Sequence, residues 1–404
     1  MSQGLDQAVR AAAGRVTAAL AARFRDLDLA EDAFSGACLK AARAWPRIGL
    51  PSDPAAWLYR AAYRHVLDEL RRREVRTRLQ PDPPEPSPSA EDRLADETQA
   101  IPDERLRLIF VCCHPAIAVE SRAALTLRLV CGLPADEIAA AFLLPPPTLL
   151  QRLTRAKRKI ADAGVPFEVP GPEGWAERLE AVLSTLEIAY AKAHADAAGA
   201  GPYAGFAAEV LQLTASLAEM LPAEGEVLGL AALVRFAEAR RPARLDGAGL
   251  MVPLSEQDPA LWSRSLIVEA EDYLYRAANA GAYGTRALTA AIHGVWCSRR
   301  SMADAAPWPE VLKLYDAMLA TRDDPVIRLN RAVALAEVDG PAAGLAEVEG
   351  LAEARLEAFQ PWHAVRADLL RRLGRIEESR AAYDRAIDLA PGPAERTWLA
   401  ARRR

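Results

Sequence analysis

The chain has 404 residues, is rich in alanine, and is 51% hydrophobic but only 6% aromatic, so two or three domains of closely packed helices are expected rather than sheets. Its net charge of −5 excludes a chain that is basic throughout, and any nucleic-acid contact must come from a local basic patch. Five cysteines, no long apolar run and no signal-peptide pattern predict a cytoplasmic protein with neither a disulfide framework nor a membrane span.

The N-terminal segment predicts a pair of helices followed by a loop. Apolar residues recur at helical spacing over residues 5–24, and a second helix is expected over residues 28–44. Asp28 is the expected N-cap of that second helix, with Glu31 three residues later as in a capping box. Several breakers over residues 45–54 predict a rigid loop before the next helix.

A third helix, predicted over residues 55–73, has an apolar face and a basic face that also carries aromatic side chains. Aromatic rings can stack on splayed bases while arginine neutralises phosphate, so the basic face is a candidate contact for a single strand. The alternative is an ordinary solvated face with Tyr63 packed into the core. The residues of this face are Arg60, Tyr63, Arg64, His65, Arg71, Arg72 and Arg73.

Residues 79–102 are rich in proline, serine and acidic residues, which predicts a flexible linker. Two helices are expected over residues 103–130, on either side of His114 and Pro115. The string Cys112-Cys113-His114 lacks the paired ligand spacing of zinc sites. Buried thiols are therefore expected there, and neither a metal nor a cofactor is.

The stretch over residues 133–160 predicts a helix-turn-helix. A short helix opens near Pro134, three consecutive prolines break it, and a second helix follows with Thr148 near its N-terminus. The second helix has an apolar inner face and a basic outer face, which suits entry into a major groove, although helical hairpins with a solvated basic face are also common. The inner residues are Leu149, Leu153, Ala156 and Ile160, and the outer residues are Gln151, Arg152, Arg155, Lys157, Arg158 and Lys159.

Taken in order, these blocks resemble a bacterial sigma factor of the extracytoplasmic-function group. The segment 28–73 is similar to sigma region 2, and the strings 106–115, 124–128 and 151–157 are similar to region 4. The Cys-Cys-His-Pro and Gln-Arg-Leu-x-Arg-Ala-Lys strings are typical of a subgroup with a long C-terminal helical extension.

The resemblance implies an all-α fold with a region-2 helical bundle at 1–78, the linker at 79–102, a region-4 helix-turn-helix domain at 103–164 and a tetratricopeptide-like regulatory domain at 165–404. It implies a protein that is not an enzyme, has no cofactor, and directs promoter recognition and transcription initiation. The implied partners are promoter DNA, the β′ clamp helices and β flap of core RNA polymerase, and a protein partner of the C-terminal domain.

The resemblance also assigns residues to each contact. The implied polymerase-binding residues are Asp28, Glu31, Asp32, Gly36, Lys40 and Arg43. The implied minus-ten DNA-binding residues are Trp45, Arg47, Trp57, Arg60, Tyr63, Arg64, His65 and Arg71. The implied minus-thirty-five DNA-binding residues are Thr148, Gln151, Arg152, Arg155, Lys157 and Arg158.

The second half of the chain predicts helices only. Residues 363–391 fit a tetratricopeptide unit with Gly374 at its turn, and residues 326–351 resemble a degenerate preceding unit. Stacked units of this kind leave a concave face. Residues Glu256, Gln257 and Asp258 and the arginines of residues 240–244 could suggest a pocket, but they are expected to form a buried ion-pair network between helices.

Two functions of different classes remain open on the sequence. One is a sigma factor that carries its own regulatory domain. The other is a helix-turn-helix regulator that carries a tetratricopeptide-type scaffold and acts without core polymerase. The region-2 block separates the two, because a repressor has no need of it.

Overall fold

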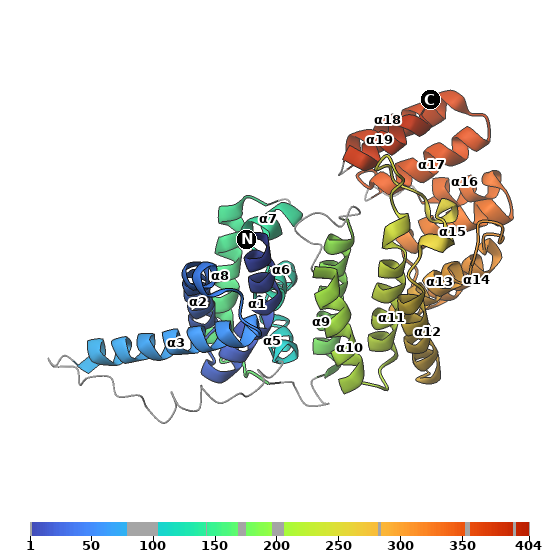
Figure 1. Ribbon diagram of the computed structural model, residues 1–404. Coiled ribbons are helices and arrows are strands. Elements are labelled where there is room, and N and C mark those ends of the chain that lie inside the picture. The colour runs from blue at the N-terminus through green and yellow to red at the C-terminus, as the bar shows by residue number, and fades with distance from the viewer. Residues whose placement is uncertain are drawn as a thin grey trace. The chain divides into compact units, whose positions relative to one another are not determined.

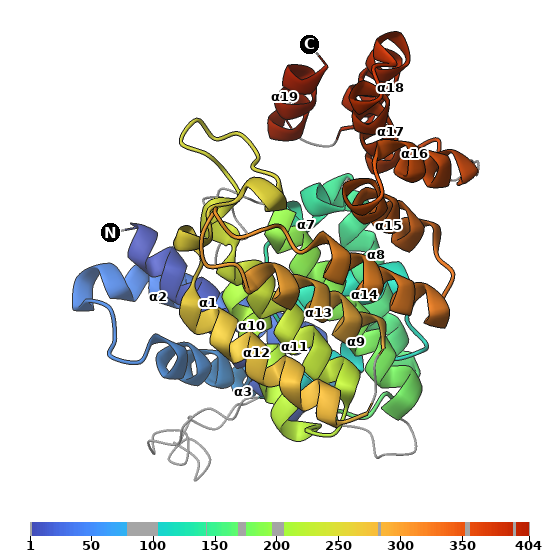
Figure 2. The same ribbon diagram turned by 90° about the vertical axis from the view of Figure 1, so that its right-hand side faces the viewer.

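The computed structural model is helical apart from turns and one isolated β-bridge between Leu245 and Met251, which confirms the predicted all-α class for the described residues (Figures 1 and 2). The chain forms two compact units, one of residues 1–193 with 202–213 and the other of residues 194–201 with 214–404. The predicted linker lies outside the described residues. These are 2–78, 104–142, 144–168, 175–195, 206–281, 284–351, 356–390 and 393–403.

Three long helices that pack on one another open the first unit, namely α1 (Ser2–Phe24), α2 (Leu27–Ile48) and α3 (Pro54–Arg78) (Figure 1). The predicted N-cap of the second helix is wrong. Asp26 and not Asp28 caps α2, because the Asp26 side chain accepts a hydrogen bond from the backbone N–H of Leu29 at 2.9 Å.

The loop predicted at residues 45–54 is shorter than expected, because α2 continues through Pro46 to Ile48. Trp45 is only 4% exposed and packs edge-on against Trp57 of α3, with 5.3 Å between the ring centroids. This packing holds the end of α2 in place, although the proline removes a backbone donor from it. Tertiary contacts therefore outweigh the local breaker signal.

Four shorter helices follow. The first of them ends just before His114 and the second begins a few residues after Pro115, close to where the sequence predicts. The second helix of the helix-turn-helix begins at Pro146, so Thr148 lies near its N-terminus as predicted. The helix includes two of the three prolines, since prolines are tolerated in a first turn whose N–H groups have no partner. The four helices are α5 (Arg105–Cys112), α6 (Val119–Leu129), α7 (Ala135–Ala141) and α8 (Pro146–Asp162).

The first unit also includes residues beyond the predicted helix-turn-helix domain. The thiol of Cys113 donates to Thr185 Oγ1 at 3.4 Å, and Arg178 donates to the carbonyl oxygen of Phe110 at 3.1 Å. These contacts attach the start of the C-terminal extension to α5. The helix concerned is α9 (Trp175–Ala195). The next helix, α10 (Phe206–Met220), contacts α5 through the ion pair of Glu209 with Arg105.

The second unit is a series of antiparallel helix pairs with apolar cores. Gly340 and Gly374, both at positive φ, make the turns between α15 and α16 and between α17 and α18, where the sequence predicts repeat turns (Figure 2). The helices are α11 (Gly225–Ala239), α12 (Arg264–Asn279), α13 (Thr285–Cys297), α14 (Trp308–Thr321), α15 (Pro325–Val338), α16 (Pro341–Gly350), α17 (Gln360–Arg372), α18 (Ile376–Leu389) and α19 (Pro393–Arg402). Three short 3-10 helices are η2 (Arg241–Ala243), η3 (Leu254–Glu256) and η4 (Pro259–Leu261).

Candidate nucleic-acid interface

Helix α8 has the two faces that the sequence predicts. Its apolar residues Leu149, Leu153, Ala156 and Ile160 are buried, and the helix packs against α6 and α7. Apolar residues that recur every three or four positions share one face, so the intervening polar residues are turned outward. Arg152 is half-buried, and the exposed polar residues of α8 are Thr148, Gln151, Thr154, Arg155, Arg158, Lys159 and Asp162.

Lys157 departs from the predicted outer face. Its side chain is 15% exposed, and its Nζ pairs with Glu31 Oε2 at 2.8 Å and with Asp28. Burial lowers the pKa of Lys157, but its hydrogen bonds with Asp28 and Glu31 outweigh burial and raise the pKa above the usual value. Arg128 of α6 donates to the same Glu31 carboxylate at 2.8 Å. The prediction that Lys157 faces outward is therefore wrong, because two carboxylates of α2 hold it. We call these four residues the Glu31 cluster.

Glycines let α1 lie directly against the turn between α6 and α7. A Cβ on Gly14 would lie 1.8 Å from the carbonyl oxygen of Val130, and one on Gly132 would lie 2.4 Å from a Cβ of α1. At the same contact, Arg10 pairs with Glu137 at 3.2 Å. The helices α1–α3 and α5–α8 are therefore packed together, with the Glu31 cluster at their contact.

The predicted minus-ten residues differ in their exposure. Tyr63 and Trp45 are buried, at 6% and 4% exposed. Arg23 donates a hydrogen bond to Tyr63 Oη at 3.1 Å, and its guanidinium lies over the Tyr63 ring. Tyr63 was predicted either to contact a base or to pack into the core, and in the structure it packs into the core. The half-buried members of this set are Trp57, Arg60 and His65, and the exposed members are Arg47, Arg64 and Arg71.

The predicted polymerase-binding residues all lie on α2. Gly36 faces the ring of His65, and a Cβ there would come within 3.0 Å of it. Sequence reasoning missed Leu39 and Ile48, apolar side chains of α2 that are 64% and 68% exposed. Apolar residues at outward positions of an amphipathic helix are the signal that would have found them. Asp28 and Glu31 belong to the Glu31 cluster, and the remaining exposed members are Asp32, Lys40 and Arg43.

The thiols of Cys112 and Cys113 are buried, as predicted. Burial raises the pKa of both, to about 11 for Cys113. Within the described ranges, no group of three or more His, Cys, Asp or Glu side chains is placed to hold a metal ion. None of the described helices is long and apolar enough to cross a membrane.

The arginine cluster at residues 240–244 has a local ion pair. Arg241 pairs at 2.6 Å with Glu238, three residues earlier, and not with residues 256–258 as the predicted network requires. Glu256, however, pairs with Arg402 of α19 at 2.8 Å and lines a pocket instead.

Comparisons with known proteins agree with this geometry. The family described as Sigma-70 region 2 matches residues 8–76, and the family described as Sigma-70, region 4 matches residues 107–160. A family of unknown function, DUF6596, matches residues 178–278. The chain is 40% identical over 405 residues to an uncharacterized protein of Rhizobium meliloti (strain 1021), covering 98% of this chain and 94% of that protein. No solved structure matches.

A region-2 helical bundle followed by a region-4 helix-turn-helix defines the subunits that give RNA polymerase its promoter specificity. The chain belongs to the sigma-70 family, as an extracytoplasmic-function-type factor with a C-terminal extension. It is an RNA polymerase sigma factor, and sigma factors are initiation factors that bind core polymerase and promoter DNA without being enzymes. A repressor that acts without polymerase would leave region 2 unexplained.

Proposed function

We propose that α8 reads the minus-thirty-five element as duplex DNA. The observation that carries this proposal is the two-faced α8, whose buried apolar side fixes which polar side chains point outward. Arginine suits both a bidentate contact with guanine and a phosphate contact. The side chains proposed to contact this element are Thr148, Gln151, Arg152, Arg155 and Arg158, joined by Lys157 when it leaves the Glu31 cluster.

For the minus-ten element, we propose that the buried residues of α2 and α3 have a supporting role and that the accessible ones contact DNA. Trp45 and Tyr63 are buried, so they support the surface rather than contact a base. Arg47, Arg64 and Arg71 are exposed and supply positive charge for phosphates. Trp57, Arg60 and His65 are half-buried beside them, where an aromatic side chain can stack on a base in a melted strand.

We propose that α2 also binds the β′ clamp helices of the polymerase, and that region 4 binds the β flap. Asp32, Lys40 and Arg43 are exposed on α2, and Leu39 and Ile48 add exposed apolar area to that helix. An exposed patch of this mixed kind is typical of a protein interface. Because polymerase and promoter lie in the cytoplasm, we place the protein there.

We propose that the extension regulates the sigma domains and that its last helix pairs are tetratricopeptide-type. The pairs α15–α16 and α17–α18 support this, with their glycine turns and with Tyr383 buried at the repeat's aromatic position. The domain limits proposed are 1–78 for region 2, 103–164 for region 4 and 165–404 for the extension. Most of helix α9, up to residue 193, lies in the first compact unit, so the start of the extension also supports region 4.

The test uses Arg155→Ala on α8, with Arg276→Ala on α12 as the matched control. Promoters are first obtained by genome-wide run-off transcription with the purified chain and core polymerase. Binding of the holoenzyme to such a fragment is then measured, with circular dichroism as the check of folding. A base-reading arginine contributes about 1–3 kcal/mol and sets specificity at one position, so Arg155→Ala should weaken binding about fivefold or more and relax that position. Equal binding by Arg155→Ala and the control would refute the placement of α8.

A further inference from the structure

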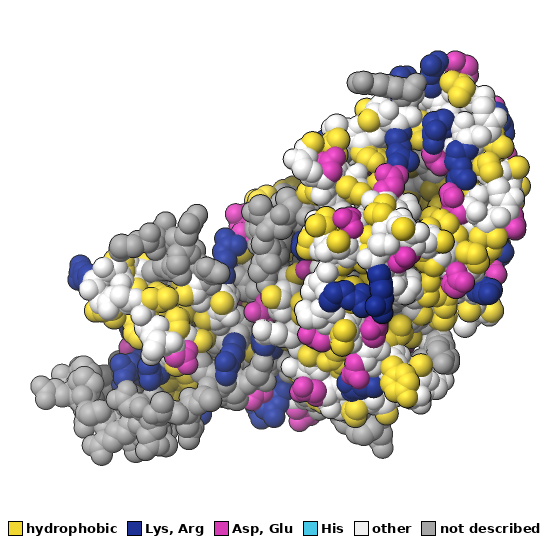
Figure 3. Space-filling model, turned by 45° about the vertical axis from the view of Figure 1, so that its right-hand side comes forward, with side chains coloured by type: hydrophobic (Ala, Val, Ile, Leu, Met, Phe, Trp, Pro, Cys, Tyr) yellow, Lys and Arg dark blue, Asp and Glu magenta, His cyan; other side chains and the backbone are white. Residues whose placement is uncertain are grey.

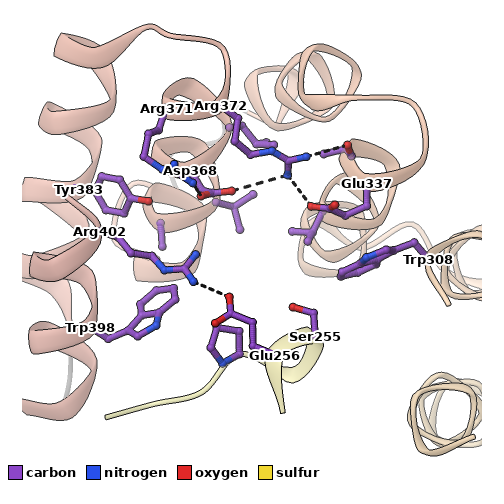
Figure 4. Close-up of a pocket in the computed structure, with 16 residues that line it drawn as sticks. Ser255, Glu256, Trp308, Glu337, Asp368, Arg371, Arg372, Tyr383, Trp398 and Arg402 are labelled. Atoms are coloured by element: carbon purple, nitrogen blue, oxygen red, sulfur yellow. Dashed lines mark hydrogen bonds and ion pairs between the residues drawn. The ribbon is translucent and has the colours of Figure 1, made fainter. Parts of the chain in front are cut away.

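A pocket with a volume of about 450 Å³ lies in the second compact unit (Figure 4). Its lining residues come from α15, α17, α18 and α19, from η3 and the residue just before it, and from the start of α14. Its lining includes the small or β-branched residues Val333, Ala336, Ala364 and Val365. Short side chains let a bound chain come close to the helices. Helical repeats commonly use such concave faces for binding.

The pocket is rich in hydrogen-bond donors. Arg371 pairs with Asp368 at 2.7 Å, and Arg402 pairs with Glu256 at 2.8 Å. The side chains of Arg371 and Arg402 are 46% and 32% exposed, so both guanidinium groups can be reached from the pocket. Each guanidinium carries five N–H donors, and one carboxylate engages two of them at most. Donors therefore remain for a ligand that accepts hydrogen bonds.

Tyr383 of α18 provides a further donor. Its side chain is 1% exposed and lines the pocket, and Figure 4 shows its oxygen turned toward the space between Asp368 and Arg402. Burial raises the pKa of the Tyr383 hydroxyl, so it stays protonated and able to donate. Arg371 opposes part of this rise by donating to the Tyr383 oxygen, which leaves the hydroxyl hydrogen without an acceptor among the described residues. A buried hydroxyl hydrogen without an acceptor is unfavourable, and a ligand acceptor would relieve it.

Two tryptophans add apolar surface to the pocket. Trp398 of α19 lies under the guanidinium of Arg402, at 4.4 Å from its ring centroid, and Trp308 lies at the start of α14 on the opposite side (Figure 4). Aromatic residues and arginine are the side chains most enriched where binding energy concentrates in protein interfaces. The pocket thus combines hydrogen-bond donors with an apolar contact surface.

Charge in this part of the chain favours an acidic ligand. Residues 361–404 contain ten arginines and six acidic residues, although the whole chain is negative. Figure 3 shows basic side chains among acidic ones over α17 to α19, at the top of that view. The pocket lining itself carries three arginines and three carboxylates, so the attraction for an acidic partner comes from the excess of arginine around the pocket.

We propose that this pocket binds a segment of a partner polypeptide in which an aspartate or glutamate lies beside a large apolar side chain. The carboxylate accepts from Arg371, Arg402 and Tyr383 Oη, and the apolar side chain packs against Trp398 and Trp308. The carboxylates of Glu256, Glu337 and Asp368 line the same pocket and repel each added negative charge. A nucleic-acid strand therefore fits less well than a peptide with one carboxylate, because the strand brings a row of phosphates.

The test selects a phage-displayed library of random linear peptides on the full-length chain. Enriched peptides are synthesised with a fluorescein label, and their affinity is measured by fluorescence anisotropy. The variants are Arg371→Gln, Arg402→Gln and Tyr383→Phe. The matched control is Arg380→Gln, since Arg380 of α18 pairs with Glu377 and is not part of the pocket lining. Thermal melting confirms that each variant folds.

Selection should enrich peptides with Asp or Glu close to Trp, Phe or Leu. Arg371→Gln and Arg402→Gln should each weaken binding roughly tenfold, since charge-assisted hydrogen bonds are lost, and Tyr383→Phe should weaken it about threefold. Arg380→Gln should match the wild type, and amidation of the peptide carboxylate should abolish binding. The proposal is overturned if selection yields no acidic peptides or if the folded variants bind as the wild type does. It is also overturned if a single-stranded oligonucleotide, and no peptide, shows the loss in these variants.

Discussion

Glu31→Gln should strengthen binding of the minus-thirty-five duplex, because it removes one of the two carboxylates that hold Lys157. In the structure the Glu31 carboxylate accepts from Lys157 and from Arg128, both at 2.8 Å. Exposed ion pairs contribute about 0.2–1 kcal/mol, and buried hydrogen bonds to charged groups about 1.5–3 kcal/mol. The Lys157 and Arg128 side chains are 15% and 32% exposed, so we expect an intermediate loss of roughly 1–2 kcal/mol. That loss corresponds to about a 5- to 30-fold shift toward free Lys157.

The assay is binding of a labelled promoter duplex at several salt concentrations, measured by fluorescence anisotropy. A freed lysine that reaches a phosphate steepens the dependence of log affinity on log salt by about one. Glu31→Gln should therefore bind more tightly at low salt and lose affinity faster as salt rises. Lys157→Met should show a shallower dependence than the wild type.

Asp32→Asn is the matched control, since Asp32 is an exposed carboxylate of α2 outside the Glu31 cluster and its loss changes the net charge equally. It separates release of Lys157 from a general gain in positive charge. The reasoning is refuted if Glu31→Gln and Asp32→Asn give the same affinity and the same salt dependence.

Four further outcomes are expected. Gly14→Ala should lower the free energy of urea unfolding by about 1–3 kcal/mol, because the new Cβ would overlap the carbonyl of Val130. Gly247 has open space around it, so the unfolding free energy of Gly247→Ala should stay within about 0.5 kcal/mol of the wild-type value. Ser379→Ala should cost about 1 kcal/mol in the same measurement, since Ser379 Oγ donates to the carbonyl of Ala367 at 2.8 Å between α18 and α17. The pKa of Lys157 in the folded state is raised above its ordinary value of 10.5, so its contribution to stability is full below that pH and is lost as pH rises through the folded-state pKa. The free energies of unfolding of wild type and Lys157→Met should therefore differ by a constant amount near neutral pH and converge in strong alkali. Ellman's reagent at about pH 8 should react slowly with the native thiols and fast with the denatured ones, because burial raises the pKa of each thiol. A fast native reaction would contradict the raised pKa of the half-buried Cys38 and the burial of Cys112, Cys113, Cys131 and Cys297.

Local spacing in the sequence was sufficient for the helical class and for the buried face of α8, while the order of the two sigma regions was implied by the resemblance to a known family. Leu149, Leu153, Ala156 and Ile160 are buried as predicted. Residues three or four apart share a helix face whatever that face packs against, so periodicity alone reveals it. The turns at Gly340 and Gly374 could also be predicted from the local sequence, since both have a positive φ, which favours glycine.

The ends of the helices were predicted less accurately than their faces, because packing between helices competes with local signals in the sequence. The breakers after Trp45 predicted a loop, yet contact with Trp57 keeps α2 helical through Pro46. An N-cap was expected at Asp28, but the cap is Asp26, two residues earlier. A single sequence holds several acceptable caps, and the packed core decides which one is used.

Only the tertiary structure decided which charged groups meet. Lys157 and Glu31 are 126 residues apart, and Arg402 and Glu256 are 146 residues apart. The first pair turns a predicted DNA contact toward α2, and the second places Glu256 in a pocket that sequence reasoning had not expected. Each charged side chain has many possible partners of opposite sign in the sequence. No periodic pattern selects among them, because the choice depends on which helix faces come together when the apolar cores are buried.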